Sequence, residues 1–460
     1  MSDPSLPPLP PPRQAKLANR LARPFLRFME LEVASAVLLL WMALLALAWA
    51  NSPWSGSYHY LWEELTLGFS LSDVVSLEMP LGGWVNDALM AVFFFAVGME
   101  IKREMVLGEL SDRSRAMLPV IGALGGMVVP ASIYLAFHAG GVAEHGWGVP
   151  MATDIAFAVA ALSVLGSRAP SGLRIFLLAL AIVDDLGAVA VIAVFYTAEI
   201  HYAALAWAGA GLALCVLLNA IGVRSIGVYV VVGVFVWFET HHSGVHATIA
   251  GVALGLITPT DRTHDNRTLV ERARAGFDHW SELLLGEDDD ATDLGGHLRH
   301  HAVRLLSVAG RNSLSPLDFL VNLLERPVAF VIMPLFALAN AGVVLDAATL
   351  SDPMAEKVGV AVALGLLVGK PVGLGLFCWV AVKLRIAEMP RGVTWPMLLA
   401  TGVLAGIGFT VALFVTSLAF DDPVHAAGSK IGILAGSVLA TVLGVWLLRR
   451  ALPEAPGPAR

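Results

Sequence analysis

Twelve long apolar segments, separated by polar loops, restrict the fold of this chain more than any other feature of its sequence. Most of them approach the ~20 residues that a helix needs to cross the hydrocarbon core of a bilayer. Only 14% of the residues are charged, whereas soluble domains carry about 25%. The sequence therefore predicts an all-α polytopic membrane protein with about twelve transmembrane helices. We expect them at residues 31–50, 84–100, 116–136, 146–166, 175–196, 204–222, 226–238, 246–258, 327–345, 358–382, 397–420 and 430–448.

The loop charges predict an orientation. Lys and Arg are absent from loops 51–83, 137–145, 197–203 and 239–245, and they gather in the alternate loops and in the N-terminal segment. Cytoplasmic loops carry the excess of basic residues, so we expect both termini in the cytoplasm of a bacterial cell, with the chain in its inner membrane. The two cysteines lie in apolar spans, which excludes a disulfide framework.

These patterns divide the chain into five parts. We expect a cytoplasmic tail at residues 1–28, helices one to eight within 29–258, a cytoplasmic insertion at 259–326, helices nine to twelve within 327–450 and a second tail at 451–460. Alternation of apolar and polar residues within residues 51–83 predicts an extracytoplasmic hairpin. Within the insertion, Leu269, Ala273, Phe277 and Trp280 recur at helical spacing, and the histidines near residues 297–301 are read as a polar loop.

Two adjacent carboxylates, Asp184 and Asp185, lie in the middle of the fifth apolar segment. An Asp near the centre of a membrane helix costs about 2.5–3.5 kcal/mol by insertion scales. Such residues face a cavity or a partner and mark ion and proton pathways. We therefore interpret the pair as a functional site. The alternative is that they are polar contacts that join helices.

Two other apolar segments are predicted to be interrupted near the middle of the bilayer. Pro150 disfavours helix just before it, and Thr153 is a suitable N-cap for a helix with Asp154 in its first turn. Residues 401–410 carry Gly406 and Gly408 at the midpoint of the eleventh segment. Interrupted helices in the two halves of a membrane protein point to the binding site of an inverted-repeat transporter.

Lys370 lies at the centre of the tenth segment, too deep for its ammonium to reach the membrane surface. It needs a carboxylate partner or must lose its proton. A purely structural ion pair is the alternative to a role in transport.

Several motifs together resemble the NhaA-type sodium/proton antiporters, in order from about residue 25 to 450. The resemblance implies that Asp185 is the principal Na⁺ and H⁺ ligand and that Asp184 is its partner and pairs with Lys370. It also implies that Thr153 and Asp154 balance helix dipoles where two broken helices cross, and that the hairpin helps to form a homodimer. The motifs are Thr153-Asp154, Ala179–Ala188, Ser243–Thr248, Met333–Gly342, Gly369–Gly373 and Gly406–Thr410.

Four residues match the family's pH-regulating positions: Glu100, Arg103, Glu104 and His246. A charged helix end and a satisfied core histidine are the alternatives. The chain departs from the family at Leu324–Val328, where better-studied members carry two sensor histidines and this sequence has none. Family-like activation at alkaline pH is therefore doubtful.

These features predict a secondary antiporter that exports Na⁺, and Li⁺ as well, in exchange for external protons, and that is electrogenic. Na⁺ is a hard cation that prefers oxygen ligands, so it competes with protons for the same carboxylates. The alternatives are a sodium-coupled symporter or a cation channel. An aspartyl protease is disfavoured because neighbouring helix residues point about 100° apart. We expect no enzymatic activity, no cofactor and no nucleic-acid partner.

Overall fold

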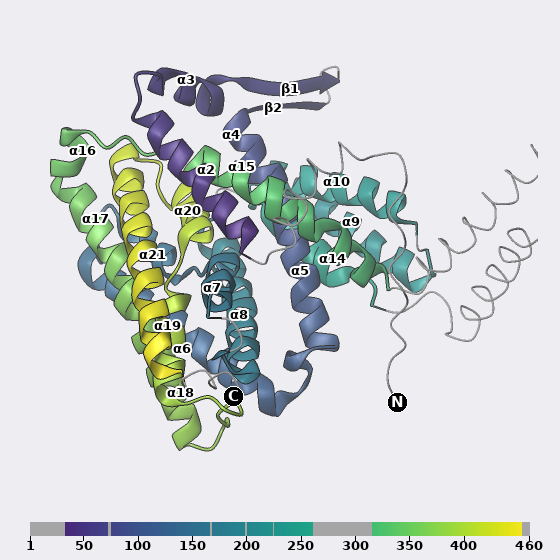
Figure 1. Cartoon of the computed structure of the whole chain (residues 1–460). Coiled ribbons are helices and arrows are strands. Elements are labelled where there is room, and N and C mark those ends of the chain that lie inside the picture. Colours follow the sequence, from purple (N-terminus) through teal and green to yellow (C-terminus); the bar gives the residue numbers. More distant parts are fainter. Residues whose placement is uncertain are drawn as a thin grey trace, which may run out of the picture.

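The computed structural model describes residues 33–71, 75–165, 168–197, 200–223, 225–260 and 315–452. Within these residues the regular secondary structure is helical apart from one β-hairpin (Figure 1). Both tails, the helical pattern at Leu269–Trp280 and the histidines near 300 lie outside the described residues.

The first half of the described chain runs from α2 to α11, with π- and 3₁₀-helical turns labelled η. Its helices are α2 (Ala34–Ala50), α3 (Ser55–His59), η1 (Tyr60–Glu64), α4 (Leu81–Gly83), η3 (Trp84–Leu89), α5 (Met90–Val106), η4 (Glu109–Ser111), α6 (Arg113–His138), η5 (Glu144–Met151), α7 (Ile155–Ser163), α8 (Ser171–Phe195), α9 (Tyr202–Ala220), α10 (Ile226–His242) and α11 (Ala247–Ile257).

The second half follows residue 315. Its helices are α14 (Pro316–Pro327), η7 (Val328–Ile332), α15 (Met333–Asn340), α16 (Ala347–Ser351), α17 (Pro353–Leu364), η8 (Gly365–Gly369), α18 (Lys370–Lys383), α19 (Trp395–Ala405), α20 (Phe409–Ala419) and α21 (Pro423–Ala451). The helices α17, α18, α19 and α21 lie together with α6 on one side of the molecule (Figure 1).

By length and apolar composition, eight helices in the described residues can cross a membrane, or nine when the bent pair α19 and α20 counts as one span. Three shorter apolar helices, α2, α10 and α11, have 17, 17 and 11 residues. Together these helices occupy all twelve predicted segments. The all-helical polytopic fold is confirmed, whereas the crossing of the three short helices stays a prediction.

The ninth span begins earlier than predicted. We expected it at residue 327, but an apolar helical stretch runs from Pro316 to Asn340. Ser315 caps it by accepting a hydrogen bond from Asp318 N, and Pro316 stands at the first helical position, where it loses no helix bond. The charged residues Asp318, Glu325 and Arg326 led us to assign this stretch to a loop. They instead form the charged face of an amphipathic helix.

A two-stranded antiparallel hairpin falls in the segment predicted for it. Strand β1 (Thr66–Leu71) pairs with β2 (Val75–Pro80), with Thr66 opposite Pro80. The preceding turn is fixed by Tyr58, whose hydroxyl lies 2.9 Å from the carbonyl oxygens of Leu338 and Ala339. Burial raises the pKa of Tyr58, so its hydroxyl stays protonated and keeps donating.

Candidate functional site

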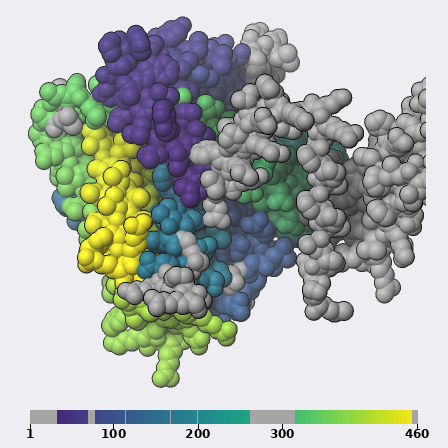
Figure 2. Space-filling model, in the orientation of Figure 1, coloured from purple at the N-terminus to yellow at the C-terminus, as the bar shows by residue number. Residues whose placement is uncertain are grey.

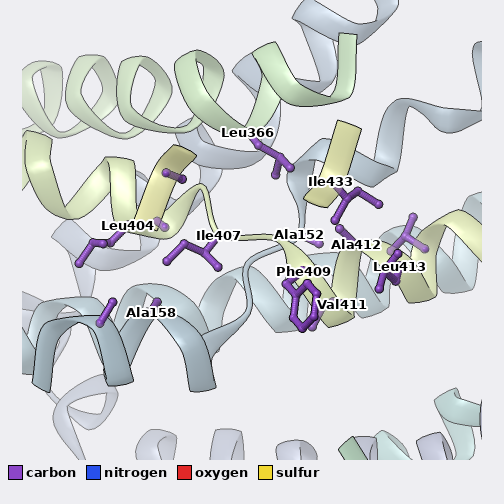
Figure 3. Close-up of a cluster of buried hydrophobic side chains, with 14 of the residues drawn as sticks. Ala152, Ala158, Leu366, Leu404, Ile407, Phe409, Val411, Ala412, Leu413 and Ile433 are labelled. Atoms are coloured by element: carbon purple, nitrogen blue, oxygen red, sulfur yellow. The ribbon is translucent and has the colours of Figure 1, made fainter. Parts of the chain in front are cut away.

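Two extended segments meet where the helices are interrupted. Residues 152–154 separate η5 from α7, and residues 406–408 separate α19 from α20, whose axes differ in direction by 47°. Figure 3 shows Ala152 beside the extended chain at Ile407. The backbone N–H of Asp154 donates to the carbonyl oxygen of Ile407 at 2.7 Å, which joins the two interruptions directly. Both predicted breaks are therefore present.

The carboxylate of Asp154 lies between the N-termini of α7 and α20. Its Oδ1 accepts from Phe157 N at 3.2 Å, and its Oδ2 accepts from Thr410 N at 3.2 Å and from the Thr410 hydroxyl. A helix N-terminus carries a partial positive charge, so one anion offsets two dipole ends here. Asp154, not Thr153 as predicted, is the N-cap of α7. The reason is that the extended chain turns Thr153 away toward Lys370.

Thr153, Asp184 and Lys370 form one buried cluster. The Lys370 ammonium donates to Asp184 Oδ2 and to Thr153 Oγ1, the latter at 2.8 Å, and the Thr153 hydroxyl lies 2.5 Å from Asp184 Oδ2. Lys370 is 2% exposed and Asp184 3%, so the pair is removed from solvent and requires its partners. The same hydroxyl is 2.8 Å from the carbonyl oxygen of Ala405, near the negative end of α19.

Asp185 is as deeply buried as Asp184 but lacks comparable support. Among the described residues, no group donates a hydrogen bond to Asp185 Oδ1 or to Asp184 Oδ1. A buried charged oxygen without a donor is unfavourable unless a proton or a cation binds it. A proton or a cation would therefore be stabilised most at these two oxygens. They come from neighbouring positions on α8, near the interruptions that bring α7 and α20 together.

An open cavity of about 500 Å³ lies along α8 toward its N-terminal end. Ile175, Leu178 and Ala179 line it on α8, and Glu104 and Asp112 bring carboxylates from the end of α5 and the start of α6. Leu178 precedes Asp185 by seven residues, which places the two on the same face of α8, about 10.5 Å apart along the helix axis. The cavity thus lies on the face of α8 that carries Asp185.

The four candidate regulatory residues lie in two places. Arg103 and Glu100 are 3.7 Å apart on α5, near the cavity that Glu104 lines. His246 is the N-cap residue of α11; its Nδ1 lies 3.0 Å from Thr248 Oγ1, and its Nε2 lies 3.8 Å from a carboxylate oxygen of Asp87. Asp87 precedes Glu100 by thirteen residues, so about 20 Å of helix separates the two groups.

The sequence interpretation missed two residues that complete these arrangements. Thr410 lies in a quoted motif but was given no role, although its hydroxyl and its N–H both bind Asp154. Asp87 was passed over, yet it faces both His246 and His241, the latter at 3.4 Å. An acidic residue at the start of an apolar span was the available signal for Asp87.

A buried ion pair and an unsupported carboxylate, placed at two interrupted helices of a polytopic bundle, define an ion-coupled membrane transporter. Comparison with known proteins gives the family. The profile of the family described as Na⁺/H⁺ antiporter 1 matches residues 26–448. The chain belongs to this family, the NhaA Na⁺/H⁺ antiporters, and is a transporter, not an enzyme.

Curated relatives cover almost the whole chain. It is 46% identical over 459 residues to Na(+)/H(+) antiporter NhaA 2 of Myxococcus xanthus (strain DK1622), covering 98% of this chain and 95% of that protein. It is 46% identical over 433 residues to Na(+)/H(+) antiporter NhaA of Oleidesulfovibrio alaskensis, covering 94% of each. Na(+)/H(+) antiporter NhaA of Rhodopirellula baltica is 44% identical over 438 residues, covering 95% of this chain and 96% of that protein.

Proposed function

We propose that this protein exports Na⁺ and Li⁺ in exchange for external protons, by alternating access around Asp184 and Asp185. The proposal rests on two buried carboxylate oxygens at the interrupted helices, to which no group in the described part of the chain donates a hydrogen bond. The curated relatives are Na⁺/H⁺ antiporters, which supports Na⁺ and H⁺ as the exchanged ions.

The exchange follows from competition for oxygen. Asp185 holds a proton when no cation is bound, because its burial and the neighbouring Asp184 carboxylate disfavour a second negative charge. Na⁺ takes that place by coordinating the same oxygens, with the Thr153 hydroxyl within reach of Asp184. When the site faces one side at a time, a bound Na⁺ leaves on one side and protons enter from the other.

Lys370 admits two roles in this scheme. In the structural role it stays protonated throughout the cycle and pairs with Asp184 while that carboxylate is ionised, and Asp184 takes up its own proton when Na⁺ is absent. In the carrier role it gives up its own proton when Na⁺ binds Asp184. We favour the structural role, since Lys370 contacts Thr153 as well as Asp184 and is therefore held as an ammonium donor to both.

The wider context is also proposed. The basic loops favour a bacterial inner membrane location with both termini in the cytoplasm. The exposed hairpin of β1 and β2 is suited to pairing with a second copy of the chain in a homodimer, because edge strands present unpaired backbone groups. Glu100, Arg103 and Glu104, near the C-terminal end of α5, and His246, at the start of α11, are proposed to tune activity with pH.

A proteoliposome assay tests the function. Vesicles with an imposed acid interior and an internal pH dye receive Na⁺, Li⁺ or K⁺. We expect Na⁺ and Li⁺ to discharge the pH gradient and K⁺ to leave it intact. An Asp185→Asn protein in matched vesicles is the control. Discharge that requires an added organic solute would support a symporter. Na⁺ flux without proton movement would support a channel, and either result would reject antiport.

A further inference from the structure

An apolar groove of about 440 Å³ runs over α19, on a surface away from the ion site. Its floor is formed by Pro396, Leu399, Ala400 and Val403, whose spacing places them on one helix face. Pro371 of α18 and Leu447 of α21 form parts of its walls. The volume falls in the range of ~300–1,000 Å³ that is usual for ligand pockets.

The groove opens at the outer surface of the helix bundle. Leu399 on its floor and Trp446 beside it on α21 are both exposed, and α21 is visible at the molecular surface in Figure 2. The groove extends from the start of α19 at Pro396 to Val403, about 10 Å along the helix axis. A hydrocarbon chain is therefore the occupant whose shape and polarity fit it.

One end of the groove carries a positive charge. Arg450 lines it, and the guanidinium lies 3.9 Å from the ring centroid of Trp446, which holds it by a cation–π contact. Among the described residues no carboxylate lies within ion-pair distance of Arg450. An oriented cation with no counter-ion in the described part of the chain, at the mouth of an apolar groove, calls for an anion joined to a hydrocarbon chain.

The surroundings favour an anion at the same end. Residues 383–395 and 444–452 contain five basic side chains and one acidic side chain, Glu388. The N-terminus of α19 lies at this mouth too, and its N-cap residue Thr394 makes no side-chain cap within the described structure. Basic pockets between membrane helices bind the headgroups of anionic lipids.

We propose that this groove binds one anionic phospholipid, with an acyl chain along α19 and its phosphate held by Arg450. The site is separate from ion transport chemistry and does not depend on which ion is carried. The acyl chain would contact Pro371, which adjoins Lys370. It would also contact Val403, which lies three residues before the interruption at Gly406. The lipid therefore covers the outer side of the segments whose inner side forms the ion site.

Native mass spectrometry of the purified protein tests this directly. Dioleoyl phosphatidylglycerol and dioleoyl phosphatidylcholine are titrated separately, and the affinity for the first bound lipid is measured. We expect wild-type protein to prefer phosphatidylglycerol. Arg450→Gln should lower that affinity by roughly fivefold or more, because a charge-assisted contact is lost. Arg450→Lys should retain most of it. Arg449→Gln is the matched control, since Arg449 does not line the groove, and it should change the affinity less than twofold.

Three results would overturn the proposal: equal affinity of the wild-type protein for both lipids, an equal loss in Arg449→Gln and Arg450→Gln, or displacement of phosphatidylglycerol by inorganic phosphate at the same concentration. The last would show an anion site without a role for the acyl chain. If Arg450→Gln does not purify as a monodisperse protein, raising the salt concentration with wild-type protein tests the charge instead. Phosphatidylglycerol binding that is insensitive to salt would then contradict the role of Arg450.

Discussion

Asp184 and Asp185 are adjacent in sequence but are held by different surroundings. Asp184 is neutralised by Lys370 and contacts Thr153, whereas Oδ1 of Asp185 has no donor among the described residues. Successive residues of a helix point about 100° apart, so one side chain reaches Lys370 while its neighbour points elsewhere. The two carboxylates should therefore respond differently to the same substitution.

We predict that Asp185→Asn abolishes Na⁺-driven proton movement with little loss of stability, because no ion pair is broken. Asp184→Asn should impair transport and also destabilise the protein by about 3–5 kcal/mol, since it leaves the buried Lys370 ammonium unpaired. Transport in proteoliposomes and thermal unfolding in detergent measure the two effects. Wild-type Na⁺ exchange by Asp185→Asn would refute the assignment of the principal ligand.

Lys370→Gln separates the two roles of the lysine. If the lysine is structural, as we expect, the variant is less stable yet still electrogenic, because both aspartate protons remain available. If the lysine carries a proton, the variant becomes electroneutral or inactive even after a second mutation restores stability. Charge movement measured on solid-supported membranes distinguishes the two. Electroneutral exchange by a stable Lys370→Gln protein would exclude the structural role.

At this scale the sequence predicted residue types better than contacts. Charges in apolar segments identified Asp184, Asp185 and Lys370, because such residues are costly in a bilayer. The pairing of Asp184 with Lys370 came from the family resemblance, since 186 positions separate them. The prediction of Thr153 as the N-cap of α7 was wrong, because Thr153 and Asp154 are both good N-cap residues. Only the contact with α20 decides between them.

Among the elements, α5 and α11 pack with their backbones in near contact through glycine. A Cβ at Gly251 would lie 2.1 Å from the carbonyl oxygen of Ala91 and 3.0 Å from Phe95 N. Small residues let membrane helices pack with their backbones in near contact. This packing brings the start of α11, with His246, beside Asp87 at the start of the second span.

We predict that Gly251→Ala destabilises the protein by about 1–3 kcal/mol, since the backbones must separate to admit the methyl group. Gly209→Ala on α9 is the matched control, because nothing lies within 4 Å of its Cβ position. The control should be neutral or slightly stabilising, as alanine favours helix over glycine. Thermal unfolding in the same detergent compares them. Equal stability of the two variants would show that α5 and α11 do not need this contact.

The sequence predicted helix interruptions well and helix starts less well. Gly406 and Gly408 lie in the break between α19 and α20. Pro150 lies inside η5, just before the break at residues 152–154. Both breaks were predictable because proline and glycine act on the backbone locally. The start of α14 was missed, since its charged face hides the apolar one. Pro371 does not break the tenth span: the π-helical turn η8 precedes it, and the helix continues to Lys383.

For the whole molecule, apolar composition predicted the all-helical architecture because a bilayer leaves the backbone few alternatives. The arrangement of the helices was beyond the sequence. Contacts such as Asp154 N with Ile407 O join residues more than 250 positions apart, and no local pattern specifies them. The membrane crossing of α11 likewise cannot be judged from its 11 residues, which are fewer than a span needs.

The charge moved in one transport cycle is a property of the whole molecule, and it follows from the number of protons that Na⁺ replaces. If Asp184 and Asp185 both bind protons when Na⁺ is absent, two protons enter for each Na⁺ exported and one positive charge moves inward. A membrane potential that is negative inside then drives Na⁺ out even without a pH gradient, at 2.3 kcal/mol per charge for about 100 mV. We predict this in vesicles clamped with valinomycin and K⁺, with a strong pH buffer on both sides to prevent pH changes.

Na⁺ efflux from these vesicles should accelerate when the interior is made negative and should slow when the potential is reversed. Asp185→Asn vesicles under the same clamp provide the leak rate, which is subtracted. The potential acts only if net charge crosses the membrane, so the sign of the response also gives the direction of charge movement. Efflux that is identical at both potentials would mean one proton per Na⁺, and only one of the two carboxylates would then exchange its proton.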